Sequence, residues 1–247
     1  KAGWPFFLAL PAAGAMAALV GVLLGLFSVR VREDFLAVTT IGINFVVVAI
    51  LQYVQLFGAS LGLAVPKPEI LGVRFGNSEI LGLLILLNVL VYLFMRHLPN
   101  SWLGLALGGV RNDEEAAASL GYNADHYKVF AFTIGTFIAG MTGSVYAHFM
   151  GFISSTDFAF PVSIGVLSMA VLGGLGSVSG PLIGALILTL APEVFRFVSD
   201  YRMLVYGGLL VLMMRFQPQG LVGDDSYLQR LWTKIRGRRE EGKANAG

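Results

Sequence analysis

The sequence predicts an all-α, polytopic membrane protein with about seven membrane crossings and a short helix in a cytoplasmic loop. Three observations lead to this prediction. Of the 247 residues, 56% are hydrophobic and only 13% are charged, whereas a soluble domain carries about 25% charged residues. The 31 glycines fit helices that approach one another closely inside a bilayer. Apolar segments recur along the chain at the length that a membrane-spanning helix requires.

The predicted crossings follow from the lengths of the apolar segments, because a helix needs about 20 apolar residues to cross the hydrocarbon core. They are, in chain order, residues 6–27, 35–57, 80–95, 129–150, 160–172, 182–197 and 203–216. The fifth segment is short and is followed by glycines. We predict a true crossing there, because a re-entrant segment would place either the C-terminal tail or the loop at Arg111 on the outer side.

The distribution of lysine and arginine predicts the side of each loop, because cytoplasmic loops carry an excess of positive charge. With the C-terminal end in the cytoplasm, twelve of these residues fall inside and five outside, which accounts for all 17. Residues 1–223 then form the transmembrane domain, with a polar loop at 110–128, and 224–247 form a charged cytoplasmic tail. Apolar residues between 227 and 235 have helical spacing, which predicts a helix at the membrane surface. This cytoplasmic placement explains the basic tail, so no nucleic-acid partner is predicted.

The polar loop contains the run RNDEEAAASLGYNADHYK at residues 111–128. Asn112 followed by Glu115 matches a capping box, which makes Asn112 the predicted N-cap. Acidic residues in the first turn and the alanines after them favour a helix, and Gly121 favours a left-handed stop. The pattern therefore predicts a helix over 113–120, roughly 12 Å long.

A helix this short is marginal in water and needs a surface to lie against. The residues alone allow two interpretations. The helix is either a capped connector that rests on its own membrane domain, or a docking helix whose small side chains allow close insertion into a groove of a partner protein. Spacing does not separate the two.

The segment EAAASLG, residues 115–121, resembles the E-A-A-x-x-x-G loop of permeases of ATP-binding-cassette importers. The longer run resembles the branched-chain amino acid permeases, with the pattern R-x-x-E-x-A-A-x-x-x-G-x-N-x-x-x-Y-K. The matching residues are Arg111, Glu114, Ala116, Ala117, Gly121, Asn123, Tyr127 and Lys128. Similar stretches in the family's order are VRVREDFLAVTTIG (29–42), YAHFMGFIS (146–154), VLGGLGSVSGPLIGA (171–185) and FQPQGLVG (216–223). The resemblance covers nearly the whole chain up to Gly223.

The resemblance implies a permease subunit of the bacterial inner membrane that moves branched-chain amino acids and is not itself an enzyme. It implies a cytoplasmic ATPase, a second permease subunit and a periplasmic solute-binding protein as partners, besides membrane lipid. No cofactor is expected on this chain, because the ATPase uses the ATP. The short helix becomes a coupling helix in a groove of the ATPase, and the implied coupling residues are Arg111, Asn112, Glu114, Glu115, Ala116, Ala117 and Gly121. Urea, other amides or other amino acids are the alternative solutes.

Three features depart from the family pattern. The family usually begins with further spans that include an S-x-G-H stretch, and since nothing here matches them, we expect an N-terminally incomplete chain. The chain has Gly165 where the family commonly has glutamate, and Phe57, Gly58 and Ala59 where it commonly has T-G-G. The last two departures bear on the solute path.

Four polar residues of the predicted spans are candidates for that path. Asn44 and Gln52 lie eight residues apart and so share a helix face; hydrogen bonding between helices is the alternative role. Tyr146 and His148 lie at the outer end of the fourth span, where a membrane-interface pair is the alternative.

Other functional classes have little support in the sequence. The absence of cysteine excludes a thiolate metal site, and the three histidines are scattered. No catalytic set for an intramembrane enzyme stands out. Acidic residues near the bilayer midplane are scarce, which argues against a proton-driven secondary carrier, and Glu193 is explained by a local ion pair with Arg196. The stretch GGLGSVSG (173–180) lacks the lysine of a phosphate loop and predicts a tight turn instead.

Overall fold

The computed structural model describes residues 6–31, 33–55, 58–70 and 73–194, together with positions 207, 208, 211 and 215. The chain divides into two compact units, residues 1–159 and 160–247, which are described one at a time. The predicted tail at 224–247 and most of the predicted span at 203–216 lie outside the described residues. Arg196, the proposed partner of Glu193, also lies outside them.

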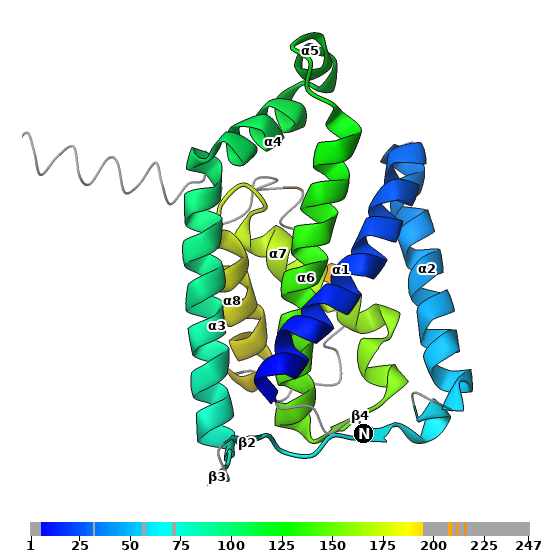
Figure 1. Ribbon diagram of the computed structural model, residues 1–247, viewed down its shortest axis with the longest axis vertical. Helices are drawn as coiled ribbons and strands as arrows, with labels where there is room; N and C mark the ends of the chain where they lie inside the picture. The colour runs from blue at the N-terminus through cyan, green and yellow to red at the C-terminus, as the bar shows by residue number, and fades with distance from the viewer. Residues whose placement is uncertain are drawn as a thin grey trace, which may run out of the picture. The chain divides into compact units, whose positions relative to one another are not determined.

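Unit 1 is built from helices joined by short irregular segments (Figure 1). Its α-helices are α1 (Phe6–Arg30), α2 (Glu33–Tyr53), α3 (Asn77–His97), α4 (Trp102–Asn112), α5 (Glu114–Ser119) and α6 (Ala124–Met150). Its strands have two residues each and are β1 (Leu63–Ala64), β2 (Glu69–Ile70), β3 (Val73–Arg74) and β4 (Phe152–Ile153). The described part of this unit also has the 3₁₀ turns η2 (Ala59–Leu61), η3 (Leu98–Asn100) and η4 (Ser155–Phe158). The predicted all-α fold class is confirmed.

Four helical segments of the described chain are long and apolar enough to cross a membrane, namely Phe6–Arg30, Asn77–Asn100, Ala124–Met150 and Ser155–Gly173. They overlap the first, third, fourth and fifth predicted crossings. The apolar helices Val38–Tyr53 and Gly180–Leu190 are shorter and overlap the second and sixth. The count of seven crossings stays a prediction.

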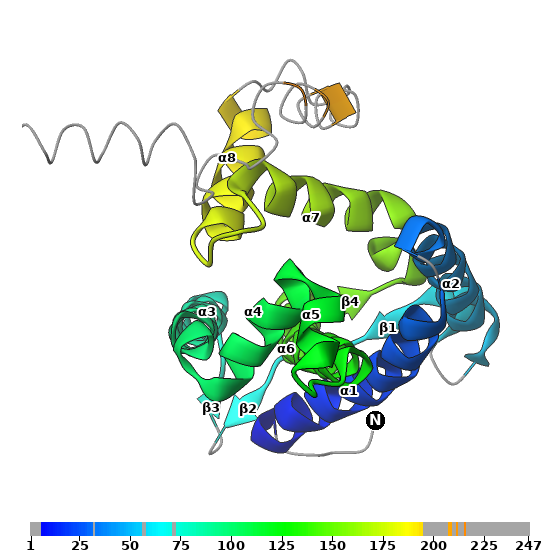
Figure 2. The same ribbon diagram turned by 90° about the horizontal axis from the view of Figure 1, so that it is seen from above.

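Small residues bring α1 and α6 together, and Figures 1 and 2 show α1 lying across α6. A Cβ on Gly21 of α1 would collide with the Thr136 side chain of α6. From the other helix, a Cβ on Gly140 would lie 2.7 Å from the carbonyl oxygen of Ala13. Side-chain-free positions on both helices therefore allow the close approach that membrane helices use for packing.

The buried residues of unit 1 are few, and its large apolar side chains point mostly outward. Phe6, Ile80 and Val145 form a buried cluster from α1, α3 and α6. Large apolar residues such as Leu86 of α3, 55% exposed, cover the helix surfaces instead. In a soluble protein, contiguous exposed apolar surface on this scale would be unusual. A lipid environment accounts for it.

The two ends of unit 1 differ in structure, as Figure 1 shows. Helices α4 and α5 lie at one end, and the short strands lie at the other. There, β1 pairs antiparallel with β4 and joins the segment after α2 to the end of α6, while β2 pairs with β3. The predicted outer loop containing Lys67 and the polar loop at 110–128 therefore lie at opposite ends, as the charge distribution requires.

Unit 2 contains α7 (Phe160–Gly173) and α8 (Gly180–Val194), packed as a helical hairpin. A Cβ on Gly184 would collide with the carbonyl oxygen of Met169, so glycine lets the two helices touch. Between them, Gly174 has a φ of 110°, and the Gly180 N–H donates to Ser177 Oγ at 3.0 Å. The predicted tight glycine turn is confirmed.

Candidate functional site: the loop at residues 110–128 and the solute-path residues

The loop is preceded by a helix that the sequence did not predict. Helix α4 begins after Ser101, whose Oγ accepts a hydrogen bond from the Gly104 N–H at 3.1 Å. Its inner face buries Ala106 and Val110, whereas Trp102 on its outer face is 71% exposed. The only cue in the sequence was a serine before an apolar run, which is a weak N-terminus signal.

The predicted N-cap at Asn112 is wrong by one residue. Asn112 is the last residue of α4, and helical backbone geometry does not suit an N-cap. Asp113 takes the extended conformation, with φ −156° and ψ 109°, and its Oδ1 accepts from the Ala116 N–H at 2.9 Å. Helix α5 therefore begins at Glu114, and the capping box with Glu115 does not form.

The predicted stop at Gly121 is confirmed. Gly121 has a φ of 87°, and its N–H donates to the Ala118 carbonyl at 2.9 Å. The Tyr122 N–H donates to the Ala117 carbonyl at 3.1 Å. These two bonds and the left-handed glycine form a Schellman motif, which satisfies carbonyls that the end of the helix leaves free.

The loop has a small apolar core of its own. Val110 of α4, Ala117 of α5 and Ala124 of α6 are buried together, and Tyr127 packs against them. Ala117 is only 5% exposed. Its small side chain therefore lets α5 lie against α4 and α6, and it points away from any partner that approaches from outside.

A charge pair joins α5 to α6, and a ring contact joins the segment after α5 to α6. Lys128 Nζ donates to Glu114 Oε2 at 2.6 Å, and both side chains are partly exposed. The Tyr122 ring meets the Tyr127 ring edge to face, with centroids 6.0 Å apart. The helix thus rests on its neighbours, as the connector interpretation expects.

A different face of α5 is left open. Ala116, Ala118 and Ser119 are exposed, and Leu120, which follows directly, is 79% exposed. The remaining predicted coupling residues, Arg111, Asn112, Glu114 and Glu115, are exposed as well. A surface of small side chains and one leucine therefore remains available for docking to a partner. Packing of the helix on its own domain does not exclude docking of its open face.

One of the two candidate solute-path residues of α2, Asn44, contacts the segment after α6. Asn44 Nδ2 donates to the Phe158 carbonyl oxygen of η4 at 3.4 Å. Asn44 Oδ1 is buried and has no hydrogen-bond partner among the described residues. Gln52 is half-buried. The alternative role for Asn44 was hydrogen bonding between helices, and the observed partner is the carbonyl of a 3₁₀ turn.

His148 and Tyr146 lie near the end of α6. His148 Nδ1 donates to the Ser144 carbonyl oxygen at 2.7 Å, so Nδ1 carries the proton. Its ring meets the Phe6 ring edge to face, with centroids 4.9 Å apart, while Tyr146 is 37% exposed. In the described structure α2 and α6 share no extended contact. The four candidates are therefore not brought together into one site.

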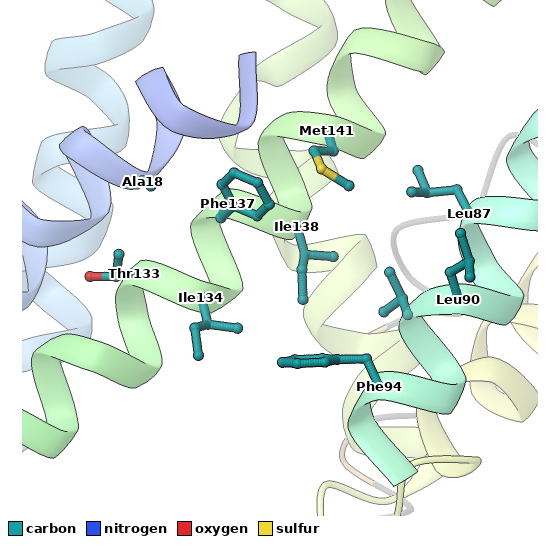
Figure 3. A pocket seen from close by; sticks show the side chains of 10 residues that line it. Ala18, Leu87, Leu90, Phe94, Thr133, Ile134, Phe137, Ile138 and Met141 are labelled. Carbon is teal, nitrogen blue, oxygen red and sulfur yellow. The ribbon is translucent and has the colours of Figure 1, made fainter. Parts of the chain in front are cut away.

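A pocket of about 470 Å³ lies between α3 and α6, with one residue from α1 at its edge (Figure 3). Its lining is apolar except for Thr133, and consists of Ala18, Leu87, Leu90, Val91, Phe94, Thr133, Ile134, Phe137, Ile138 and Met141. Thr133 Oγ1 donates to the Val129 carbonyl at 2.8 Å. Burying the ammonium and carboxylate of an amino acid here would leave both charges without partners, at a high cost. The pocket suits an aliphatic chain better than a zwitterion.

No group of three or more possible metal ligands occurs among the described residues.

Gly165, which stands where the family commonly has glutamate, is buried in α7. Among the departures in the second span, Gly58 has a φ of 85°, and Phe57 lies outside the described residues. A left-handed backbone favours glycine at position 58.

Long helices with outward-facing apolar side chains define a multi-pass helical membrane protein. Its polar loop contains a short helix that is capped at both ends. Comparison with known proteins is more specific. The chain belongs to the family described as branched-chain amino acid transport system / permease component, and the match spans residues 1–214.

Several relatives have related names. The chain is 36% identical to the high-affinity branched-chain amino acid transport system permease protein LivM of Escherichia coli, over 89% of this chain and 58% of the relative. It is 25% identical to a probable LivM of Methanocaldococcus jannaschii, over 87% of this chain and 67% of that protein. It is 32% identical to LivH of Escherichia coli, over 53% of this chain and 42% of that protein. The chain thus spans less than two thirds of the first relative's length. No solved structure is significantly similar to it.

Proposed function

We propose that this chain is the membrane-spanning part of a permease subunit that imports branched-chain amino acids across the bacterial inner membrane. ATP hydrolysis by a cytoplasmic ATP-binding-cassette ATPase drives the transport. The names of the relatives support the solute class. The partner proteins are a second permease subunit and a periplasmic solute-binding protein. The chain carries no catalytic chemistry, and ATP is used by the ATPase.

One observation carries the mechanism. Helix α5 has six residues, too few to be stable alone in water, yet it is capped at both ends. The structure therefore supports a preformed element at one end of unit 1, with a face of Ala116, Ala118, Ser119 and Leu120 left open. A partner groove that covers this face would bury Leu120 and accept the flat alanine surface closely.

The docked helix transmits motion as follows. Closure of the ATPase on ATP displaces α5, and α5 displaces α4 and α6 through the buried contacts of Ala117. Helix α6 packs against α1, so the membrane domain rearranges and the solute path opens alternately to either side. Asn44, Gln52, Tyr146 and His148 remain candidates for lining that path.

Uptake by the reconstituted complex tests the proposal. The full-length permease, its partner permease, the ATPases and the binding protein are placed in proteoliposomes, and uptake of leucine, isoleucine, valine, alanine, lysine and urea is measured. We expect ATP-dependent uptake of the three branched-chain amino acids in preference to the others. Preferred uptake of urea or lysine would reject the solute class, and uptake without ATP would reject the importer mechanism.

The docking step has its own test. Leu120→Asp places a charge on the open face without touching the core of the loop, and Trp102→Asp changes an exposed apolar residue of α4 as a matched control. We expect Leu120→Asp to reduce co-purification of the ATPase and Trp102→Asp to retain it. Equal retention by both variants would favour the connector interpretation.

A further inference from the structure

The attachment of α5 to α6 contains a charge pair that bridges fourteen positions of the chain. Lys128 Nζ lies 2.6 Å from Glu114 Oε2. Glu114 is the first residue of α5, and Lys128 lies in the second turn of α6. Between them the chain reverses direction at Gly121, whose φ is 87°. The pair therefore closes the turn that joins the two helices.

Interactions within α6 do not explain a lysine at position 128. A carboxylate in the first turn of a helix, such as Glu114 in α5, is favoured by the helix dipole, whereas the dipole acts little on Lys128 in the second turn of α6. Asp125 lies three residues before Lys128 on α6, within reach of an intrahelical pair. Lys128 Nζ nevertheless bonds to Glu114. The charge of Lys128 therefore forms a contact between α6 and α5 and not one within α6.

We propose that Lys128 is a positioning residue for energy coupling, which fixes the orientation of α5 on α6 by holding Glu114. This rests on the proposed function, in which α5 docks into the ATPase. The small core at Ala117 sets how close α5 lies to its neighbours, but the short side chains of Ala117 and Ala124 constrain the rotation of α5 only weakly. A charge-assisted hydrogen bond at the first residue of α5 restricts that freedom, because such bonds are shorter and about twice as strong as neutral ones.

The pair affects the orientation of α5 more than the folding stability of the permease. Exposed ion pairs contribute little to folding, and these side chains are 36% and 44% exposed. Loss of the pair therefore leaves the permease inserted and α5 present. With its orientation relaxed, part of the ATPase movement turns α5 without moving α6, so ATP is hydrolysed without transport.

A charge exchange tests the proposal in the full complex in proteoliposomes. The variants are Glu114→Lys, Lys128→Glu, their combination, and Lys128→Gln as a milder change, with Asp125→Asn as the control. The measured quantities are solute transported per ATP hydrolysed, ATPase co-purification and membrane yield. Because an exposed pair at the top of its usual range corresponds to about a fivefold change, we expect each charge reversal to lower transport per ATP by about that factor. Lys128→Gln lowers it about twofold.

The combined variant, which restores opposite charges, should regain at least about half of the lost coupling, and Asp125→Asn should keep it all. Unchanged coupling in the single variants overturns the proposal. So does failure of the combined variant to recover, which would mean that Glu114 and Lys128 act separately. Loss of ATPase co-purification in the single variants would assign the pair to docking, and lower yield would assign it to folding. If the unsubstituted permease retains no ATPase, the proposed function itself fails.

Discussion

Gly121 offers the sharpest test of how α5 ends. Its φ of 87° lies in the left-handed region, which costs residues with a Cβ roughly 1–2 kcal/mol. Nothing lies within 4 Å of a Cβ built at this position, so the cost comes from the backbone and not from a clash. Set against a helix of six residues, this cost reduces the population of the capped conformation by a factor of about 5–30.

Three substitutions at Gly121 separate the effect of backbone conformation from the effect of side-chain size. Gly121→Ala should weaken ATPase co-purification and uptake, and Gly121→Val should weaken both further, because β-branched residues avoid positive φ most strongly. Gly121→Asn should be the mildest of the three, since asparagine tolerates the left-handed conformation although its side chain is larger than that of alanine. Membrane yield should stay constant, because the residue is exposed.

The assay is pull-down of the ATPase from detergent-solubilised membranes, with uptake measured in parallel. If Gly121→Asn binds less ATPase than Gly121→Ala, side-chain bulk against the partner decides the outcome and the backbone reasoning is refuted. If all three variants bind normally, the end of α5 has no part in docking. A fall in yield that matches the fall in binding would show a folding defect instead.

Three further predictions concern the caps, the α1–α6 contact and the topology. Asp113→Ala should weaken ATPase pull-down by about 0.5–2 kcal/mol through loss of the N-cap, while Asn112→Ala should have little effect; equal effects would contradict the observed cap. Gly21→Leu should reduce the yield of monodisperse protein in size-exclusion chromatography, because overpacking costs about 1–3 kcal/mol, and Gly42→Leu, where a Cβ meets nothing within 4 Å, should not. Because this sequence lacks cysteine, an impermeant thiol reagent outside cells should label Lys67→Cys and leave Asn112→Cys unlabelled; labelling at both positions would refute the charge-based topology.

The helix α5 shows what local sequence predicts and where it fails. Its end was predicted because a left-handed turn at Gly121 depends on one residue. Its beginning was misplaced by one residue because α4 was not foreseen. The glycines of α4 at 104, 108 and 109 are poor helix formers, and burial of Ala106 and Val110 stabilises the helix instead. That burial depends on tertiary packing.

Sequence spacing also did not predict which residues the candidate site residues contact. Ala117 was expected to face a partner, and its burial depends on where α4 and α6 lie around it. His148 packs on Phe6, which lies far away in sequence. Asn44 hydrogen-bonds to the Phe158 carbonyl across more than a hundred residues. Periodicity predicts which residues share one helix face, but contacts between helices depend on how the helices pack.

Helix α6 spans the whole of unit 1 without a proline, from the polar loop to β4. Its 27 residues correspond to roughly 40 Å of continuous helix. A single residue inserted near its middle would rotate everything beyond it by about 100° and shift it by about 1.5 Å. Either the pairing of β4 with β1 or the alignment of α6 with α5 would then be lost. The number of residues in α6 is therefore constrained at both ends, so this helix should tolerate many apolar substitutions but no insertion or deletion.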